Sequence, residues 1–130
     1  MEKLRIAVLN TSKEITNVLA VVFREEGHET CESFTYLYRG DDKSFDKFIA
    51  ECNPDVIIFD IAIPYEENYD LFKKLSQRDC VKHTPFILTT TNKAVLEKLV
   101  GKTSSHELVG KPYDLKQIVS AAERAVNVHH

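Results

Sequence analysis

The sequence predicts a single doubly wound α/β domain, in which a five-stranded parallel sheet carries helices on both faces. Two observations lead to this prediction: five strand-like apolar segments alternate with five helical patterns, and no linker, internal repeat or low-complexity segment interrupts them. Strands that alternate with helices form parallel sheets through right-handed crossovers. The 130 residues are an ordinary length for one domain, so residues 1–128 are assigned to it. His129 and His130 are set aside as a candidate tag remnant.

The first half of the chain predicts three strands and two helices. The segment from Val56 to Phe59 is apolar at every position, which is typical of a central parallel strand covered on both faces. Helical spacing of apolar residues ends at Gly27 and again before Asn53-Pro54, and both places favour a turn. The elements expected here are strands at 5–10, 29–36 and 55–60, a helix over 13–26, a polar turn at 39–43 and a helix ending at Cys52.

The second half predicts two further strands and three helices. Pro85 precedes an apolar, β-branched segment that is typical of a buried strand. A polar loop is expected between Pro64 and a helix that begins near Leu71, and Gly101 is expected to close the next helix. The elements expected here are strands at 86–91 and 108–109 and helices over 71–78, 95–100 and 115–126.

Composition narrows the class of protein. The formal net charge is −3, which argues against a dedicated nucleic-acid-binding domain, because such domains concentrate Lys and Arg. The apolar segment near the N-terminus, Ile6 to Leu9, is too short for a membrane span or a secretory signal, so a cytoplasmic protein is expected. The three cysteines are odd in number and lack a Cys-x-x-Cys pair, which predicts free thiols rather than a disulfide framework or a zinc site.

Polar residues at the predicted strand ends are the candidates for chemistry, since ligands of such folds bind at the carboxyl ends of the strands. Asp60 ends a buried strand and needs a cation there, and Lys111 is the cation available at the end of the last strand. Thr90 offers a hydroxyl donor beside them. Asp60 is then a candidate nucleophile toward phosphorus. The alternative is a carboxylate that caps the following loop, with Lys111 at the surface.

Three fragments at matching spacing resemble response-regulator receiver domains over essentially the whole chain. The segment 54–64 is similar to the phosphoacceptor strand and loop, with Asp60 followed four residues later by Pro64. Thr90 lies thirty residues beyond Asp60, and Lys111, which begins Lys-Pro-Tyr, lies twenty-one residues further on. The resemblance implies a flavodoxin-like fold with strand order 2-1-3-4-5, Asp60 as phosphoacceptor, and Thr90 and Lys111 as the residues that stabilise the phosphoryl group.

The sequence departs from the receiver pattern at the metal site. The family ends the first strand with two acidic residues that hold Mg²⁺, whereas this chain has Asn10 and Thr11. The remaining candidate ligands are Asp60, the Asn10 side-chain carbonyl and the backbone carbonyl of Ala62. Mg²⁺ prefers carboxylate oxygens, so weak metal binding and slow metal-dependent phosphorylation are expected. Asp41 and Asp42 are candidates to replace the lost acidic pair, against the simpler interpretation of a polar turn with solvated charges.

Other departures concern signalling and access. Leu108 occupies the switch position at which the family has an aromatic residue, and Thr91 replaces a small residue and is expected to narrow access to the acceptor. Asn68 stands at a loop position that is usually Gly, where its tolerance of left-handed backbone is an advantage. Thr11 and Ser12 either donate to a flavin phosphate at the following helix or cap that helix. The remaining polar candidates, expected to be surface or loop residues, are His28, His83 and His106.

Three functions are consistent with these residues. The first is an atypical receiver domain whose Asp60 accepts a phosphoryl group from a histidine kinase or phosphotransfer protein, with no enzymatic activity beyond phosphorylation and dephosphorylation of Asp60. The second is a pseudo-receiver that binds a partner without phosphorylation, a hypothesis that Asn10, Thr11 and Leu108 favour. The third is a flavodoxin-like enzyme that binds flavin or another ligand. A homodimer is a further expectation from the family resemblance, and the output partner is not predicted.

Overall fold

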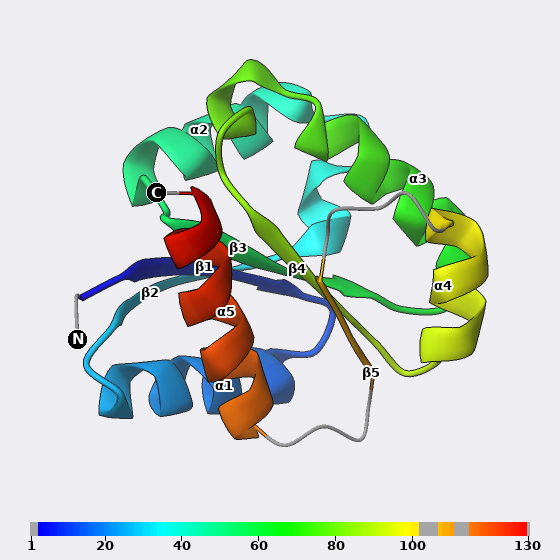
Figure 1. The fold of residues 1–130 in the computed structure, drawn as a ribbon. Coiled ribbons are helices and arrows are strands. Elements are labelled where there is room, and N and C mark those ends of the chain that lie inside the picture. Colours follow the sequence, from blue (N-terminus) through cyan, green and yellow to red (C-terminus); the bar gives the residue numbers. More distant parts are fainter. Residues whose placement is uncertain (1–2, 102–106, 111–114, 130) are drawn as a thin grey trace.

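The fold is a parallel sheet between two layers of helices (Figure 1). The computed structural model describes residues 3–101, 107–110 and 115–129. The sheet order is β2-β1-β3-β4-β5, and all four strand pairs are parallel. Helices α1 and α5 lie on one side of the sheet, and α2, α3 and α4 lie on the other. The α/β class and the order of the first four strands are therefore as predicted, and β5 pairs with β4 at the edge of the sheet.

The elements alternate along the chain, with two short 3-10 helices, η1 and η2, between them. The strands are β1 (Arg5–Asn10), β2 (Glu29–Phe34), β3 (Val56–Ile61), β4 (Phe86–Thr90) and β5 (Glu107–Gly110). The helices are α1 (Lys13–Glu25), η1 (Thr35–Tyr38), α2 (Asp42–Cys52), α3 (Tyr65–Ser76), η2 (Asp79–Val81), α4 (Lys93–Val100) and α5 (Leu115–His129).

Strand alternation divides the apolar residues of β3 between two cores. Ile57 and Phe59 pack with α2, α3 and α4 on one face, whereas Val56 and Ile58 pack with α1 and α5 on the other. All six residues of β3 are buried, as expected for a central parallel strand. Because side chains of a strand alternate, Asp60 points to the same side of the sheet as Ile58.

Two segments differ from the sequence prediction. Helix α3 begins at Tyr65 rather than near Leu71, because Pro64 precedes the first turn and the carboxylates of Glu66 and Glu67 stabilise it. Asn68 is consequently a buried helical residue and not a loop residue in a left-handed conformation. Strand β2 ends at Phe34, two residues earlier than predicted, and the chain turns into η1.

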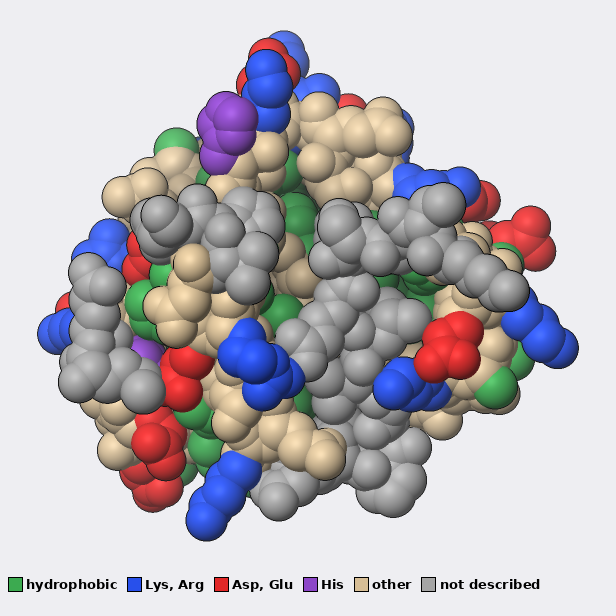
Figure 2. Space-filling model, viewed as in Figure 1, with side chains coloured by type: hydrophobic (Ala, Val, Ile, Leu, Met, Phe, Trp, Pro, Cys, Tyr) green, Lys and Arg blue, Asp and Glu red, His purple; other side chains and the backbone are tan. Residues whose placement is uncertain are grey.

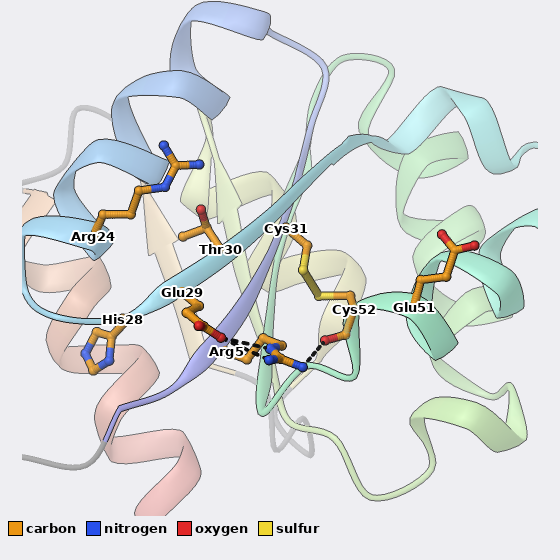
Figure 3. Close-up of a pocket in the computed structure, with 8 residues that line it drawn as sticks. All are labelled: Arg5, Arg24, His28, Glu29, Thr30, Cys31, Glu51 and Cys52. Carbon is orange, nitrogen blue, oxygen red and sulfur yellow. Dashed lines mark hydrogen bonds and ion pairs between the residues drawn. A yellow bond between two sulfur atoms is a disulfide. The ribbon is translucent and has the colours of Figure 1, made fainter.

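The cysteines are the clearest correction to the sequence analysis. Cys31 in β2 and Cys52 at the end of α2 form a disulfide, with their Cα atoms 6.0 Å apart (Figure 3). The bridge faces a pocket of about 470 Å³, where the Arg5 guanidinium donates to the Cys52 carbonyl at 3.3 Å and pairs with Glu29. The two sulfurs meet because β2 and α2 lie close together in the fold, and the spacing of the cysteines in the sequence does not predict this disulfide. Cys80 is a free thiol, as predicted, but it is exposed rather than buried or half-exposed.

The surface carries charges of both signs. Basic and acidic side chains are interspersed over the face shown in Figure 2. Within the described residues, no helix has the length and apolar character that crossing a bilayer requires.

Candidate functional site

Three buried polar side chains meet at the carboxyl end of the sheet centre. Asn10 ends β1, Asp60 lies one residue before the end of β3, and Thr89 lies opposite Asp60 in β4. Their exposed fractions are 1%, 2% and 0%. The position is where the strand order reverses between β1 and β3, the usual ligand site of doubly wound sheets. A carboxylate buried this deeply requires donors around it.

Thr89, and not Thr90, is the hydroxyl that contacts Asp60. The Thr89 hydroxyl donates to Asp60 Oδ1 at 2.6 Å, a short distance typical of a charge-assisted bond. Thr90 points to the opposite side of the strand, where its hydroxyl donates to the Ile61 carbonyl at 2.9 Å. The same oxygen accepts from the Asn92 backbone N–H at 3.3 Å. Spacing along the chain pointed to Thr90, whereas the register of β3 and β4 places Thr89 opposite Asp60.

The Asn10 side chain forms hydrogen bonds within the turn that connects β1 to α1. Its side-chain oxygen accepts from the backbone N–H groups of Thr11 at 2.7 Å and Ser12 at 3.0 Å. Ser12 in turn caps α1 by accepting from the Ile15 N–H at 3.3 Å. Ser12 is therefore a helix cap, and these N–H groups, which a flavin phosphate would need, already have acceptors.

A chain of hydrogen bonds connects the loop after β3 to Arg39. The Asn68 side-chain N–H donates to the Ala62 carbonyl at 2.7 Å, and the Asn68 oxygen accepts from the Arg39 guanidinium. Arg39 follows η1, in a segment that the sequence analysis treated only as a polar turn. Its neighbours in sequence give no functional signal, because Arg39 approaches Ala62 only through the fold.

Pro64 immediately precedes α3, and Thr91 immediately follows β4. The Thr91 hydroxyl lies 2.7 Å from the Tyr65 hydroxyl, which joins the end of β4 to the start of α3. Pro64 precedes α3 through a cis peptide bond from Ile63, and Ile63 is 75% exposed. Both residues lie in segments that follow β3 and β4, and narrowing of the access to Asp60 by Thr91 stays a prediction.

Several predicted residues lie elsewhere or outside the described part of the chain. Lys111 is outside the described residues, and Leu108 is placed only as a backbone position of β5 opposite Leu88. Asp41 caps α2 by accepting from the Ser44 N–H and hydroxyl, and Asp42 pairs with Arg78 at 3.5 Å. Neither carboxylate replaces the missing acidic pair.

His28 also differs from its prediction as a surface or loop histidine. It is 4% exposed, its Nδ1 accepts from the Leu4 N–H at 3.0 Å, and its Nε2 lies 3.1 Å from the Glu123 carboxylate. The backbone donor fixes the proton of a neutral ring on Nε2. His28 therefore joins the start of β1 to α5 and is structural.

The residues present do not fit a Mg²⁺ site of the receiver type. The Asn10 oxygen accepts two backbone N–H groups, and an amide donor, Asn68, occupies the Ala62 carbonyl. The described residues contain no group of three or more His, Cys, Asp or Glu side chains able to hold a metal. Mg²⁺ needs several oxygen ligands in near-octahedral geometry, and the neutral donors here are directed at the protein.

Comparison with known proteins gives distant relatives of one kind. No protein-family model matches the chain. It is 26% identical over 128 residues to the DNA-binding transcriptional regulator NtrC of Azospirillum brasilense, covering 98% of this chain and 25% of NtrC. It is 23% identical over 126 residues to protein PilG of Pseudomonas aeruginosa, covering 95% of this chain and 87% of PilG.

A solved structure has the same fold over the full chain. The receiver domain of the Francisella response regulator 1452 superposes with a TM-score of 0.70 at 22% identity, covering 98% of this chain and 100% of that one. The fold and the buried carboxylate at the strand-order reversal define a doubly wound α/β domain with a polar site at the carboxyl end of its sheet. In sequence and in fold, the chain is therefore similar to response regulators and to a receiver domain.

Proposed function

We propose that this chain is a receiver domain and accepts a phosphoryl group on Asp60, with little or no help from Mg²⁺. The observation that carries the proposal is the buried Asp60 carboxylate at the end of β3, hydrogen-bonded by Thr89 at 2.6 Å. An Asp60 oxygen attacks the phosphorus of a phosphohistidine or an acyl phosphate. The new P–O bond forms as the bond to the leaving group breaks, and the donor departs as free histidine or carboxylate. Lys111 and the Thr89 hydroxyl, which donates to Asp60 Oδ1, are proposed to stabilise the phosphoryl oxygens. The Thr90 hydroxyl instead donates to the Ile61 carbonyl.

The weak metal site is part of the same proposal. Asn10 and Thr11 supply no carboxylate, and the hydrogen bonds of Asn10 and Ala62 compete with any cation. Mg²⁺ affinity in the millimolar range or weaker is therefore expected, on the order of magnitude that loss of two carboxylate ligands implies. Micromolar binding in a calorimetric titration would contradict the proposal.

The proposed partners follow from the receiver class. The phosphodonor is a histidine kinase or a phosphotransfer protein, and the partner that reads the phosphorylated state is an output domain or protein. Because the chain corresponds to only 25% of NtrC but to 87% of PilG, both an attached and a separate output are consistent with the relatives. Phosphorylation at Asp60 would act by shifting the population of two surface conformations.

A pseudo-receiver that never accepts phosphate is the second candidate. The observation that favours it is the turn formed by Asn10, whose side-chain oxygen is committed to backbone N–H groups. In that case the Asp60–Thr89 bond is structural only, and the domain binds its partner constitutively.

Intact-protein mass spectrometry after incubation with acetyl phosphate distinguishes the two candidates. The wild type is expected to gain a single phosphoryl group, and the Asp60→Asn variant none, because an amide is not a nucleophile toward phosphorus. Asp60→Asn is expected to keep the fold, since its side-chain oxygen can still accept from Thr89. Asp70→Asn is the matched control, because Asp70 is an exposed helix residue paired with Lys73. The absence of an adduct on the wild type, also with a purified kinase as donor, would establish the pseudo-receiver.

A further inference from the structure

Arg39 lacks the ion pair that three other arginines of the described residues form with a carboxylate. Arg5, Arg24 and Arg78 each pair with a carboxylate, at 3.0, 2.8 and 2.5 Å. Among the described residues, Arg39 has no carboxylate within ion-pair distance, and its guanidinium donates to the neutral oxygen of Asn68. Within the described part of the chain, its positive charge is therefore not paired with a carboxylate.

The position of this charge is set by the loop after the acceptor. Asn68 is 6% exposed and connects Arg39 to the Ala62 carbonyl, two residues beyond Asp60. Ala62 is the residue whose carbonyl the sequence analysis named as the main-chain metal ligand. An amide donor thus contacts the carbonyl that a receiver of the usual pattern would direct at a cation, and the guanidinium is bonded to that amide group.

We propose that Arg39, held by Asn68, supplies the positive charge that binds the phosphoryl oxygens on Asp60 in place of a metal ion. This inference rests on the proposed function of Asp60. A guanidinium presents five N–H donors in a planar fork that matches phosphate geometry, and the bond to Asn68 uses one of its amino groups. Arg39 is exposed, and the proposal requires its side chain to turn from Asn68 toward the phosphoryl group.

The loss of the acidic pair at the end of β1 makes an arginine a suitable substitute for the metal ion on electrostatic grounds. A receiver with two acidic residues at the end of β1 would hold a cation between carboxylates, and an arginine beside them would be neutralised. With Asn10 and Thr11 there, no such carboxylate pair competes for the guanidinium. Arg39 carries one charge where Mg²⁺ carries two, and we therefore expect phosphorylation that is slow but independent of added metal.

The test measures the rate of phosphoryl adduct formation from acetyl phosphate by intact mass, in EDTA and in excess Mg²⁺. Wild type is expected to form the adduct at similar rates in both. Arg39→Gln should lose on the order of tenfold to hundredfold of the rate in EDTA, as for removal of one donor to a developing charge. Arg39→Lys should recover part of it, because the charge returns without the fork.

The control is Arg24→Gln, because Arg24 is an exposed arginine that pairs with Glu32 in β2. It should react at the wild-type rate in EDTA, and far-ultraviolet circular dichroism should show each variant folded. An unchanged rate for Arg39→Gln, or a wild-type adduct that forms only with Mg²⁺, would overturn the role of Arg39 while Asp60 remains the acceptor. No wild-type adduct under either condition would overturn the proposed function, and this inference with it.

Discussion

Asn10 illustrates how one residue changes the chemistry available at a strand end. An aspartate there could bind a cation, whereas the Asn10 oxygen accepts from the Thr11 and Ser12 N–H groups and shapes the turn into α1. The sequence identified Asn10 as a departure from the receiver pattern. The hydrogen bonds add the reason, because an oxygen with two backbone donors is a poor metal ligand.

Thr89 is expected to stabilise the buried Asp60 carboxylate. Thr89→Val should lower the free energy of unfolding by roughly 1.5–3 kcal/mol, the cost of losing a hydrogen bond to a charged group. Urea unfolding followed by circular dichroism measures the change, and Thr89→Ser, which keeps the hydroxyl, should stay near the wild type. A Val variant as stable as wild type would show that the Asp60–Thr89 bond adds nothing.

Cys80 is expected to react slowly with alkylating reagents despite its exposure. Partial burial and the hydrogen bond that its thiol donates to Asp46 at 3.3 Å raise the pKa of Cys80 to about 11. The reactive thiolate is therefore scarce below that pH. Asp46→Asn should lower the pKa of Cys80 and speed alkylation several-fold at a pH of about 8. Iodoacetamide labelling followed by mass spectrometry measures the rate, and Asp70→Asn should leave it unchanged.

At the scale of elements, the sequence pattern predicted every described strand and α-helix but neither η1 nor η2, and it misplaced some ends. The start of α3 was missed because its first turn carries the polar residues 65–68, and Asn68 is buried only through bonds to Ala62 and Arg39. The end of β2 was missed because Tyr36 favours a strand by propensity, yet it stacks on Phe34 in η1, with ring centroids 5.4 Å apart.

The disulfide fastens α2 to β2. Cys31 and Cys52 are separated by 21 residues, and closing a loop of this size stabilises a fold by about 3 kcal/mol. A reductant should therefore lower the free energy of unfolding of wild type by up to about that amount, and leave Cys31→Ser unaffected.

Alkylation without reductant checks the same bridge directly. One modified cysteine, Cys80, is expected in the folded wild type and in the unfolded protein. Modification of all three cysteines after unfolding without reductant would contradict the disulfide and would show that all three are free thiols, as the sequence predicted. Cys80→Ser is the control, because its stability should respond to reductant as the wild type does.

At the scale of the whole molecule, exposed carboxylates should make stability fall in acid. Hydrogen bonds from Arg78, Ser44 and Arg5 hold the pKa values of Asp46, Asp41 and Glu29, respectively, below their usual range. Each folded-state pKa lies below the unfolded one, so the contribution is present above the unfolded pKa of about 4 and is lost as the pH falls through the folded value.

Urea unfolding over a pH series measures this loss. The free energy of unfolding should decrease below about pH 4, and Asp46→Asn should show a shallower decrease because its ion pair with Arg78 is already absent. An equal slope in wild type and variant would show that the Asp46–Arg78 pair does not contribute.

The sequence by itself predicted the parallel α/β fold and Asp60 as the candidate acceptor, because apolar segments indicate buried strands, helical spacing indicates the covering helices, and a carboxylate at the end of a buried strand stands out. The order of the strands in the sheet came only from the resemblance to receiver domains. Tertiary structure alone decided that Thr89 contacts Asp60, that Cys31 meets Cys52, and that Arg39 approaches Ala62. Cys31 and Cys52 are 21 positions apart, so only the fold brings them together. The contact of Thr89 with Asp60 depends on the register of two strands, which local sequence does not determine.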